Sequence, residues 1–196
     1  MAWIIVGLGN PGEEYDHTRH NTGRMAVQHF AKSTESSAWR EDSKAKAQVT
    51  KGSLGKNLFA LILPDTFMNK SGSALLKYVK SVKAAERMIV VYDDLDLPLG
   101  KIKISFDRGS GGHKGIESIA RAVKTKRFVR IRVGVSPTTP SGKLRKPEGD
   151  ADVEKFILGY FKDAEMDVLK KVFKETGDAI ATIMEGGYAI AMNRFN

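Results

Sequence analysis

The sequence predicts a single three-layer α/β domain over residues 1–196, a twisted, mixed but mostly parallel β-sheet flanked by helices. Three observations support this prediction. A length of 196 residues fits one domain, because domains usually hold about 100–200 residues. Short apolar runs alternate along the chain with segments whose apolar residues recur at helical spacing. No internal repeat and no domain linker interrupts this alternation.

Five segments have strand patterns. Continuous apolar runs, typical of central strands buried on both faces, occur at residues 2–8, 58–63 and 88–92. Residues 101–106 and 129–135 alternate instead between apolar and polar side chains. Since side chains alternate across a strand, each of these two should have one core face and one polar, basic face. The basic positions are Lys101, Lys103, Arg130 and Arg132.

Four segments have the helical spacing of apolar residues: 22–32, 73–82, 115–124 and about 163–186. The last is the longest, with Asp163 as its expected N-cap and Gly186-Gly187 as its expected stop. A long loop follows the fifth strand at residues 136–150 and is rich in Pro, Gly, Lys and Arg. We expect this loop to be mobile and to cover a site.

Composition excludes several classes of protein. The longest apolar runs have strand length, far short of the roughly 20 residues that cross a bilayer, so we do not expect a membrane protein. The absence of cysteine excludes disulfides, thiolate metal sites and a cysteine nucleophile. Lys and Arg number 32 against 23 Asp and Glu, a net charge of +9. This balance favours a polyanionic partner, nucleic acid first and an anionic membrane surface second.

Residues 7–12, Gly-Leu-Gly-Asn-Pro-Gly, match the GxGxxG pattern of dinucleotide sites directly after a strand. That fingerprint also requires a helix that opens at the third glycine and an acidic residue about 20 positions later. Residues 13–21 are polar and aperiodic, and Glu35 follows a helix rather than a strand. We therefore interpret the pattern as a turn that closes the first strand, with Asn10 facing a cleft.

The titratable residues offer two kinds of site. The cluster Asp93-Asp94-Leu95-Asp96 follows an apolar strand, and ligands bind at such strand ends in α/β sheets. The cluster would either hold Mg²⁺ for phosphodiester chemistry or supply one aspartate that orients a histidine. A solvated turn suits Asp94 or Asp96 better than Asp93. The chain has four histidines, His17, His20, His29 and His113, and none of them belongs to an HExxH motif. This argues against a zinc site built on histidines.

The chain offers no obvious nucleophile for covalent acyl transfer, because it has no GxSxG motif and no cysteine. What remains is a histidine that activates water, together with a carboxylate that fixes its tautomer and stabilises the imidazolium. Such a pair suffices for hydrolysis of an activated ester, which needs far less assistance than an amide.

A glycine-rich segment, residues 109–115, leads into the third expected helix. It is not a Walker A loop, because Lys114 neither follows Gly nor precedes Ser or Thr. Exposed N–H groups at a helix N-terminus still attract anions, and Lys114 favours that interpretation over a purely structural turn. The strand cations would extend one basic surface from here, and the long loop would add Lys143, Arg145 and Lys146.

At this point seven blocks of the sequence, in order and spread over most of the chain, resemble the bacterial-type peptidyl-tRNA hydrolase family. Together they are far more specific than any single motif above. The blocks are VGLGNPG (6–12), EYDHTRHNTG (14–23), PDTFMNKSG (64–72), YDDLDLPLG (92–100), GGHKG (111–115), RIRVGV (130–135) and FILG (156–159).

The resemblance implies a monomeric, cytoplasmic α/β hydrolase that uses no metal or other cofactor. It would cleave the ester that joins a peptide, or an N-blocked amino acid, to the 3′ end of tRNA, releasing tRNA for reuse in translation. At matching positions, His20 would be the general base that activates water, and Asp93 would orient it. Asn10 would contact the acyl end of the substrate and help to distinguish blocked from free amines.

The resemblance also implies the residues that bind substrate. Asn69 would position the scissile region or the water, while Tyr15 and Phe67 would shape the cleft for the peptide and the terminal nucleotide. Arg132 would hold a tRNA phosphate beside the basic strand that contains Lys103.

The chain departs from the family pattern at two positions and one loop. Lys114 stands where the family commonly has Asn, and an ammonium only donates whereas an amide also accepts, so Lys114 would instead bind a phosphate. Ser105 replaces a Lys that partners the phosphate-binding Arg, and the loop at 138–150 is longer. These departures suggest a eukaryotic or organellar branch of the family. A eukaryotic member could be mitochondrial, which is the alternative to the cytoplasmic location. Compensating cations would be Lys101, Lys103 or Arg108.

Two other functions stay open. A relative that retains the fold and the basic face would only bind RNA, as plastid intron-splicing relatives do. A Mg²⁺-dependent nuclease built on Asp93, Asp94 and Asp96 would lose activity in EDTA. The hydrolase is favoured by the intact set Asn10, His20, Asn69 and Asp93.

Overall fold

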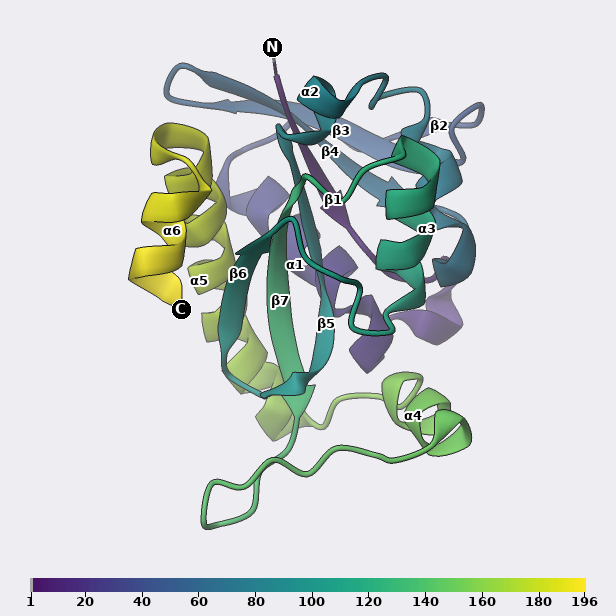
Figure 1. Cartoon of the computed structure of the whole chain (residues 1–196), viewed down its shortest axis with the longest axis vertical. Coiled ribbons are helices and arrows are strands. Elements are labelled where there is room, and N and C mark those ends of the chain that lie inside the picture. The colour runs from purple at the N-terminus through teal and green to yellow at the C-terminus, as the bar shows by residue number, and fades with distance from the viewer. Residues whose placement is uncertain (1) are drawn as a thin grey trace.

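Seven strands form one mixed sheet in the order β2-β3-β4-β1-β5-β7-β6. The sheet is seen in the computed structural model of the chain, which describes residues 2–196 (Figure 1). The strands are β1 Trp3–Gly7, β2 Arg40–Asp42, β3 Ala47–Leu54, β4 Asn57–Pro64, β5 Met88–Pro98, β6 Ile102–Phe106 and β7 Val129–Ser136.

The centre of the sheet is parallel. β1 pairs with β4 on one side and β5 on the other, and β5 pairs with β7. β1, β4 and β5 are covered on both faces, which is why their sequences contain nearly continuous apolar runs, whereas β7 alternates between apolar and polar residues. The remaining pairs, β2 with β3, β3 with β4 and β6 with β7, are antiparallel. The mixed, mostly parallel sheet expected from the sequence is therefore confirmed.

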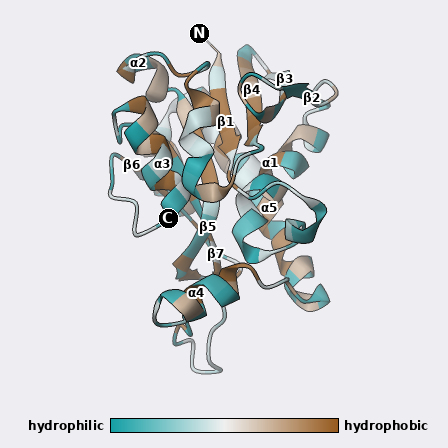
Figure 2. Cartoon of the chain, turned by 90° about the vertical axis from the view of Figure 1, so that its right-hand side faces the viewer, coloured by the Kyte–Doolittle hydropathy of each residue, from teal (hydrophilic) through white to brown (hydrophobic). Residues whose placement is uncertain are grey.

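Helices cover both faces of the sheet and give it two cores. α1, α5 and α6 pack on one face, while η3, α2 and α3 pack on the other. Figure 1 shows α5 and α6 on the opposite side of β7 from α3, and Figure 2 shows hydrophobic residues along the strands between them. The helices are η1 Glu13–Tyr15, η2 Arg19–Asn21, α1 Thr22–Ser33, η3 Met68–Leu75, α2 Val82–Ala85, α3 Lys114–Val123, α4 Asp150–Ile157, α5 Asp163–Gly186 and α6 Tyr188–Phe195.

The structure corrects two helix predictions. The helix expected at 73–82 is instead the 3₁₀ helix η3, followed by a turn and by α2, whose cap Ser81 accepts a hydrogen bond from Ala84 N at 3.1 Å. η3 packs so closely on α3 that a Cβ at Gly72 would lie 2.2 Å from Ser118 O. The N-cap of α5 is Lys162 rather than Asp163. No helix within residues 2–196 is long and apolar enough to cross a membrane.

Four short or weakly patterned elements were not expected from the sequence. β2 is short, and β3 contains Lys51 and Gly52 and lies half-exposed beside β4. α4 buries none of its residues, and α6 follows the two glycines that were expected to end the chain's last helix. Hydrophobic periodicity is weak in such segments because only a few of their side chains face a core.

Candidate active site

The end of β1 and the middle of β5 meet the start of α1. Leu8 N donates a hydrogen bond to Val91 O at 3.0 Å, which continues the pairing of β1 with β5. α1 approaches the same point, and it needs glycine at position 23, since a Cβ there would lie 2.1 Å from Val91 O. η2 directly precedes α1, so its residue His20 is carried to β5 beside Asp93.

Asp93 is buried between two imidazoles. Nδ1 of His20 lies 3.0 Å from both carboxylate oxygens of Asp93, and Nε2 of His113 lies 3.1 Å from Oδ1. The two histidine rings are 5.2 Å apart, and the ring of Tyr92 meets His113 edge-on at 4.8 Å. The structure thus brings His20 and Asp93 together and adds His113, which sequence reasoning did not assign to the site. Its one local signal was its place just before a predicted helix.

The helix α3 fixes the tautomer of His113. Nδ1 of His113 accepts hydrogen bonds from the backbone N–H groups of Gly115 and Ile116, at 3.2 and 3.4 Å, and so caps the helix. A nitrogen that accepts carries a lone pair, so the neutral ring has its proton on Nε2 and donates it to Asp93. His20 donates through Nδ1 to the same carboxylate, which leaves Nε2 of His20 with the lone pair that a general base needs.

The charge of Asp93 follows from its surroundings. Burial would raise the pKa of this carboxyl, because it removes the carboxylate from water. The neighbouring imidazoles of His20 and His113, and the hydrogen bonds they donate, outweigh burial and hold the pKa of Asp93 well below its usual range. Asp93 is therefore ionised at neutral pH and would stabilise a positive charge on the imidazole of His20.

The same three residues also have the composition of a small metal site. One donor atom of each of His20, Asp93 and His113 lies within 4.8 Å of the others. These atoms already face each other in hydrogen bonds, and the second ring nitrogen of His113 is occupied by α3. A metal would have to replace both hydrogen bonds to Asp93, so the arrangement fits proton transfer better than metal binding.

The aspartates that follow Asp93 do not converge on one ion. They continue along β5, where successive side chains point to opposite faces. Asp94 accepts a hydrogen bond from Nε of Arg132 at 2.6 Å, and Asp96 accepts one from Nζ of Lys146 at 2.7 Å. The solvated turn expected for Asp94 is therefore wrong, because this residue lies in a strand and forms a partly buried ion pair. Each aspartate has its own cationic or imidazole partner, which does not favour the Mg²⁺ site.

Asn10 is fixed by hydrogen bonds on three sides. Its backbone N–H donates to Oδ1 of Asn21 at 2.8 Å, and Nδ2 of Asn21 donates to its carbonyl at 3.0 Å. Oδ1 of Asn10 accepts from the backbone N–H of Met68 at 2.9 Å. With that oxygen occupied, the side chain of Asn10 offers an approaching ligand the N–H donors of its amide. Sequence reasoning placed Asn10 at a cleft but did not find Asn21, its support.

Two aromatic side chains pack against each other beside the segment that hydrogen-bonds to Asn10. The rings of Tyr15 and Phe67 meet edge to face, with centroids 6.4 Å apart, and Phe67 is 57% exposed. Phe67 precedes Met68, the residue that hydrogen-bonds to Asn10. Asn69 follows on η3 and is exposed. Their exposed apolar surface and amide suit contact with a ligand.

The basic strand face is only partly exposed. Lys103 and Arg132 lie directly opposite each other on β6 and β7. Arg130 shares their face, but it is 1% exposed because the preceding loop folds over it, and its guanidinium donates to the carbonyl oxygens of Arg108 and Gly109. The exposed position expected for Arg130 is therefore wrong, whereas Lys103 is exposed and Arg132 is partly so.

The glycine-rich segment before α3 has a different form from the expected anion site. Gly111 and Gly112 have φ values of 63° and 82°, so the turn itself favours glycine. The N–H groups of Gly115 and Ile116 are occupied by His113. Lys114, the first residue of α3, is exposed, so an anion here would be bound by its ammonium rather than by these two N–H groups.

The segment after β7 is anchored beside His20 through the side chain of Arg19. The pair Thr138 and Leu144 closes a small hairpin within the loop that leaves β7 at the bottom of Figure 1. Beyond α4, Arg19 donates to the carbonyl of Tyr160 at 2.8 Å and to the carboxylate of Glu165 at 3.0 and 3.2 Å. Because Arg19 precedes His20, the start of α5 is anchored against the loop that carries His20.

Comparisons with known proteins agree with each other. The model of the peptidyl-tRNA hydrolase family matches residues 4–196. The chain is 39% identical over 194 residues to the peptidyl-tRNA hydrolase of Alkaliphilus oremlandii, with 98% of each chain covered. It is 40% identical over 195 residues to that of Caldanaerobacter subterraneus subsp. tengcongensis, with 99% of each covered. These relatives are bacterial, so they lend no support to the expected organellar branch.

A solved structure shows the same fold. The crystal structure of peptidyl-tRNA hydrolase from Acinetobacter baumannii superimposes with a TM-score of 0.86 at 28% sequence identity. The match covers 98% of this chain and 93% of that one, so it includes the sheet, both helical layers and the site.

Proposed function

This chain belongs to the peptidyl-tRNA hydrolase family, and from that membership we propose how its site hydrolyses the ester of peptidyl-tRNA. The observation that carries the proposal is the pair of hydrogen bonds from His20 Nδ1 to the buried, ionised Asp93. They direct the lone pair of Nε2 away from Asp93 and make His20 the general base.

The reaction needs one water and no covalent intermediate with the enzyme. Nε2 of His20 takes a proton from water as the oxygen attacks the ester carbonyl carbon. Asp93 stabilises the imidazolium that results, as a buried carboxylate does for a catalytic histidine. The bond between the carbonyl carbon and the 3′ ribose oxygen then breaks, and His20 returns the proton to that oxygen. The products are the free carboxylic acid and tRNA with a free hydroxyl.

Asn10 and Asn69 contact the acyl end in this proposal. Because Oδ1 of Asn10 is occupied by Met68 N, Asn10 donates through Nδ2 to a carbonyl oxygen. A blocked amine brings such a carbonyl and a free amine does not, which gives a physical basis for selecting blocked substrates. Asn69 orients the scissile region or the water, and Tyr15 and Phe67 form the walls of the cleft.

The tRNA backbone would be bound by cations beside the site. Lys103 and Arg132, opposite each other on neighbouring strands, would contact one phosphate. Lys114 would contact another at the start of α3 in place of an amide. The enzyme would act in the cytoplasm and as a monomer. It would need no metal, since the proposed proton transfers use only His20 and water.

The test is release of the acyl group from N-blocked aminoacyl-tRNA, beside the unblocked form, with EDTA present. We expect hydrolysis of the blocked form alone. His20→Ala should lower kcat by about 10²–10⁴ and leave tRNA binding nearly unchanged. Equal loss of turnover and tRNA binding would contradict the role of His20 as general base. Inhibition by EDTA would favour the Mg²⁺-dependent nuclease instead. Tight tRNA binding without turnover would instead indicate the RNA-binding relative.

A further inference from the structure

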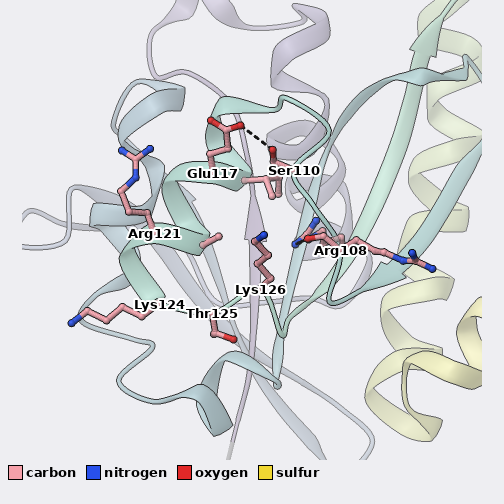
Figure 3. A pocket seen from close by; sticks show the side chains of 10 residues that line it. Arg108, Ser110, Glu117, Arg121, Lys124, Thr125 and Lys126 are labelled. Carbon is pink, nitrogen blue, oxygen red and sulfur yellow. Dashed lines mark hydrogen bonds between the residues drawn. The ribbon is translucent and has the colours of Figure 1, made fainter.

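A pocket whose lining does not include His20 lies between α3 and the start of β7. It has a volume of about 490 Å³ and an open mouth. Figure 3 shows Arg121 and Lys124 on one side of it, Arg108 on the other and Lys126 between them. The lining residues are Arg108, Ser110, Ile116, Glu117, Ala120, Arg121, Lys124, Thr125, Lys126 and Arg130.

The wall of the pocket contains a fixed positive charge. The guanidinium of Arg130 donates to two backbone carbonyls and lies 4.7 Å from the centre of the Phe128 ring, while its Nε is buried without a partner. Neither contact neutralises it. Burial raises the pKa of nearby Tyr92 to about 12, so that hydroxyl also stays neutral. An arginine keeps its proton in such a setting.

Within residues 2–196, the other cations of the pocket form no ion pair. These cations are the four side chains of Arg108, Arg121, Lys124 and Lys126. The one carboxylate in the lining, Glu117, accepts a hydrogen bond from Ser110 at 2.9 Å. Five cations therefore face one carboxylate, an imbalance that an anion of several charges would relieve.

The pocket continues the basic face that begins at Lys103 and Arg132. Arg130 lies two residues from Arg132 along β7, a separation of about 7 Å. Along α3, ten residues separate Lys124 from Lys114, which is about 15 Å. A ligand that touches both His20 and this pocket must therefore be extended and carry charge along its length.

We propose that this pocket binds phosphodiester groups of the tRNA body, away from the ester that is hydrolysed. The inference rests on the proposed function for its substrate, and extends the contact surface from the acceptor end to the far end of α3. A free nucleotide offers the same phosphate chemistry but is too short to span the two sites. The open mouth and the spread of cations along the rim suit a backbone that passes over the pocket.

Salt-dependent binding of deacylated tRNA tests the proposal. The double variant Lys124→Gln/Lys126→Gln removes two pocket charges, and Lys171→Gln/Lys174→Gln removes two from exposed positions on α5, on the other face of the sheet. If two phosphate contacts are lost, the slope of log K against log salt becomes shallower by about 1.4–1.8, and affinity near 0.15 M salt falls by roughly tenfold or more. The α5 control should change neither. Equal slopes for the pocket variant and wild type would overturn the proposal.

Two substrates separate this proposal from the proposed function. N-blocked aminoacyl-tRNA spans the pocket, whereas N-blocked aminoacyl-adenosine does not reach it. The pocket variant should raise KM for the first by roughly tenfold, with kcat unchanged, and leave kcat/KM for the second unaltered. If the wild-type protein cleaves neither substrate, the proposed function is overturned. The salt dependence of tRNA binding would still test whether the pocket binds phosphodiester groups. A titration with ATP tests whether the pocket binds a free nucleotide instead. If the wild-type protein binds ATP and the pocket variant does not, while both bind tRNA equally well, the pocket is not a tRNA-binding site.

Discussion

Nε2 of His113 donates a hydrogen bond to Asp93 over 3.1 Å while its Nδ1 caps α3. One imidazole therefore links a helix end to the carboxylate that hydrogen-bonds to His20, the proposed general base. This relationship gives His113 two separable roles, a cap that stabilises the helix and a donor that holds Asp93.

His113→Asn should separate these roles. Asn is a good N-cap, but its shorter side chain cannot also reach Asp93. We expect near-normal stability and a kcat about tenfold lower, the equivalent of about 1.4 kcal/mol for one hydrogen bond to a charge. His113→Ala should lose about 1 kcal/mol of stability as well. Full activity of His113→Asn, with urea unfolding measured in parallel, would remove His113 from the positioning network.

Asp94 forms an ion pair with Arg132, and in the proposed tRNA contact this carboxylate would compete with a phosphate for the guanidinium. Arg132→Gln should weaken tRNA binding and flatten its salt slope by about 0.9 for one lost phosphate contact. Asp94→Asn should act in the opposite direction and strengthen binding by up to about fivefold, because it frees a partly exposed pair. Binding titrations over a range of salt concentrations measure both effects. Unchanged slopes in both variants would place Arg132 outside the tRNA contact surface.

Lys114→Gln tests the departure from the family pattern. If the exposed ammonium binds a phosphate, the variant should flatten the salt slope by about 0.9 with kcat on a saturating substrate unchanged. Lys114→Asn restores the amide of the family. A variant that alters kcat but not the salt slope would show that position 114 acts on the scissile region instead.

Asp42 predicts how stability responds to acid. Hydrogen bonds from Lys77 and Tyr78 lower the pKa of this carboxyl to about 2 from its usual 3.8. A group whose pKa is lower in the folded state contributes stability above the unfolded pKa and loses it as the pH falls through the folded one. Asp42→Asn should therefore be less stable than wild type at neutral pH, with a difference that shrinks between pH 3.8 and about 2. Urea midpoints across this range check it, and a constant difference would contradict it.

Gly72 reports on the contact between η3 and α3. A Cβ at this position would meet Ser118 O at 2.2 Å and the side chain of Ala122 at 2.8 Å. Gly72→Ala should destabilise the protein by about 1–3 kcal/mol, since backbone must move. Gly109, with nothing within 4 Å of an added Cβ, provides the control, and Gly109→Ala should change stability by less than about 0.5 kcal/mol. Similar melting temperatures for both variants would show that η3 moves freely from α3.

The local pattern of apolar residues was enough to predict the strands at the parallel centre of the sheet and the helices α1, α3 and α5. Their side chains repeat at the period of a strand or helix because many of them face a core. Residues 73–82 have the same helical period, yet the chain forms the end of η3, a turn and the start of α2 there. The spacing of apolar residues records which side chains are buried, but it does not distinguish an α-helix from a 3₁₀ helix followed by a turn.

The fold class, the family and the proposed site residues His20, Asp93 and Asn10 could be predicted from residue types and their order along the chain. The pairing of these groups could be seen only in the folded chain. The tertiary structure gave Asp93 a second imidazole from a segment 20 residues later, gave Asp94 to Arg132 and buried Arg130 in the wall of a basic pocket. The physical reason is that hydrogen bonds and burial depend on distances between strands and helices that are far apart in sequence.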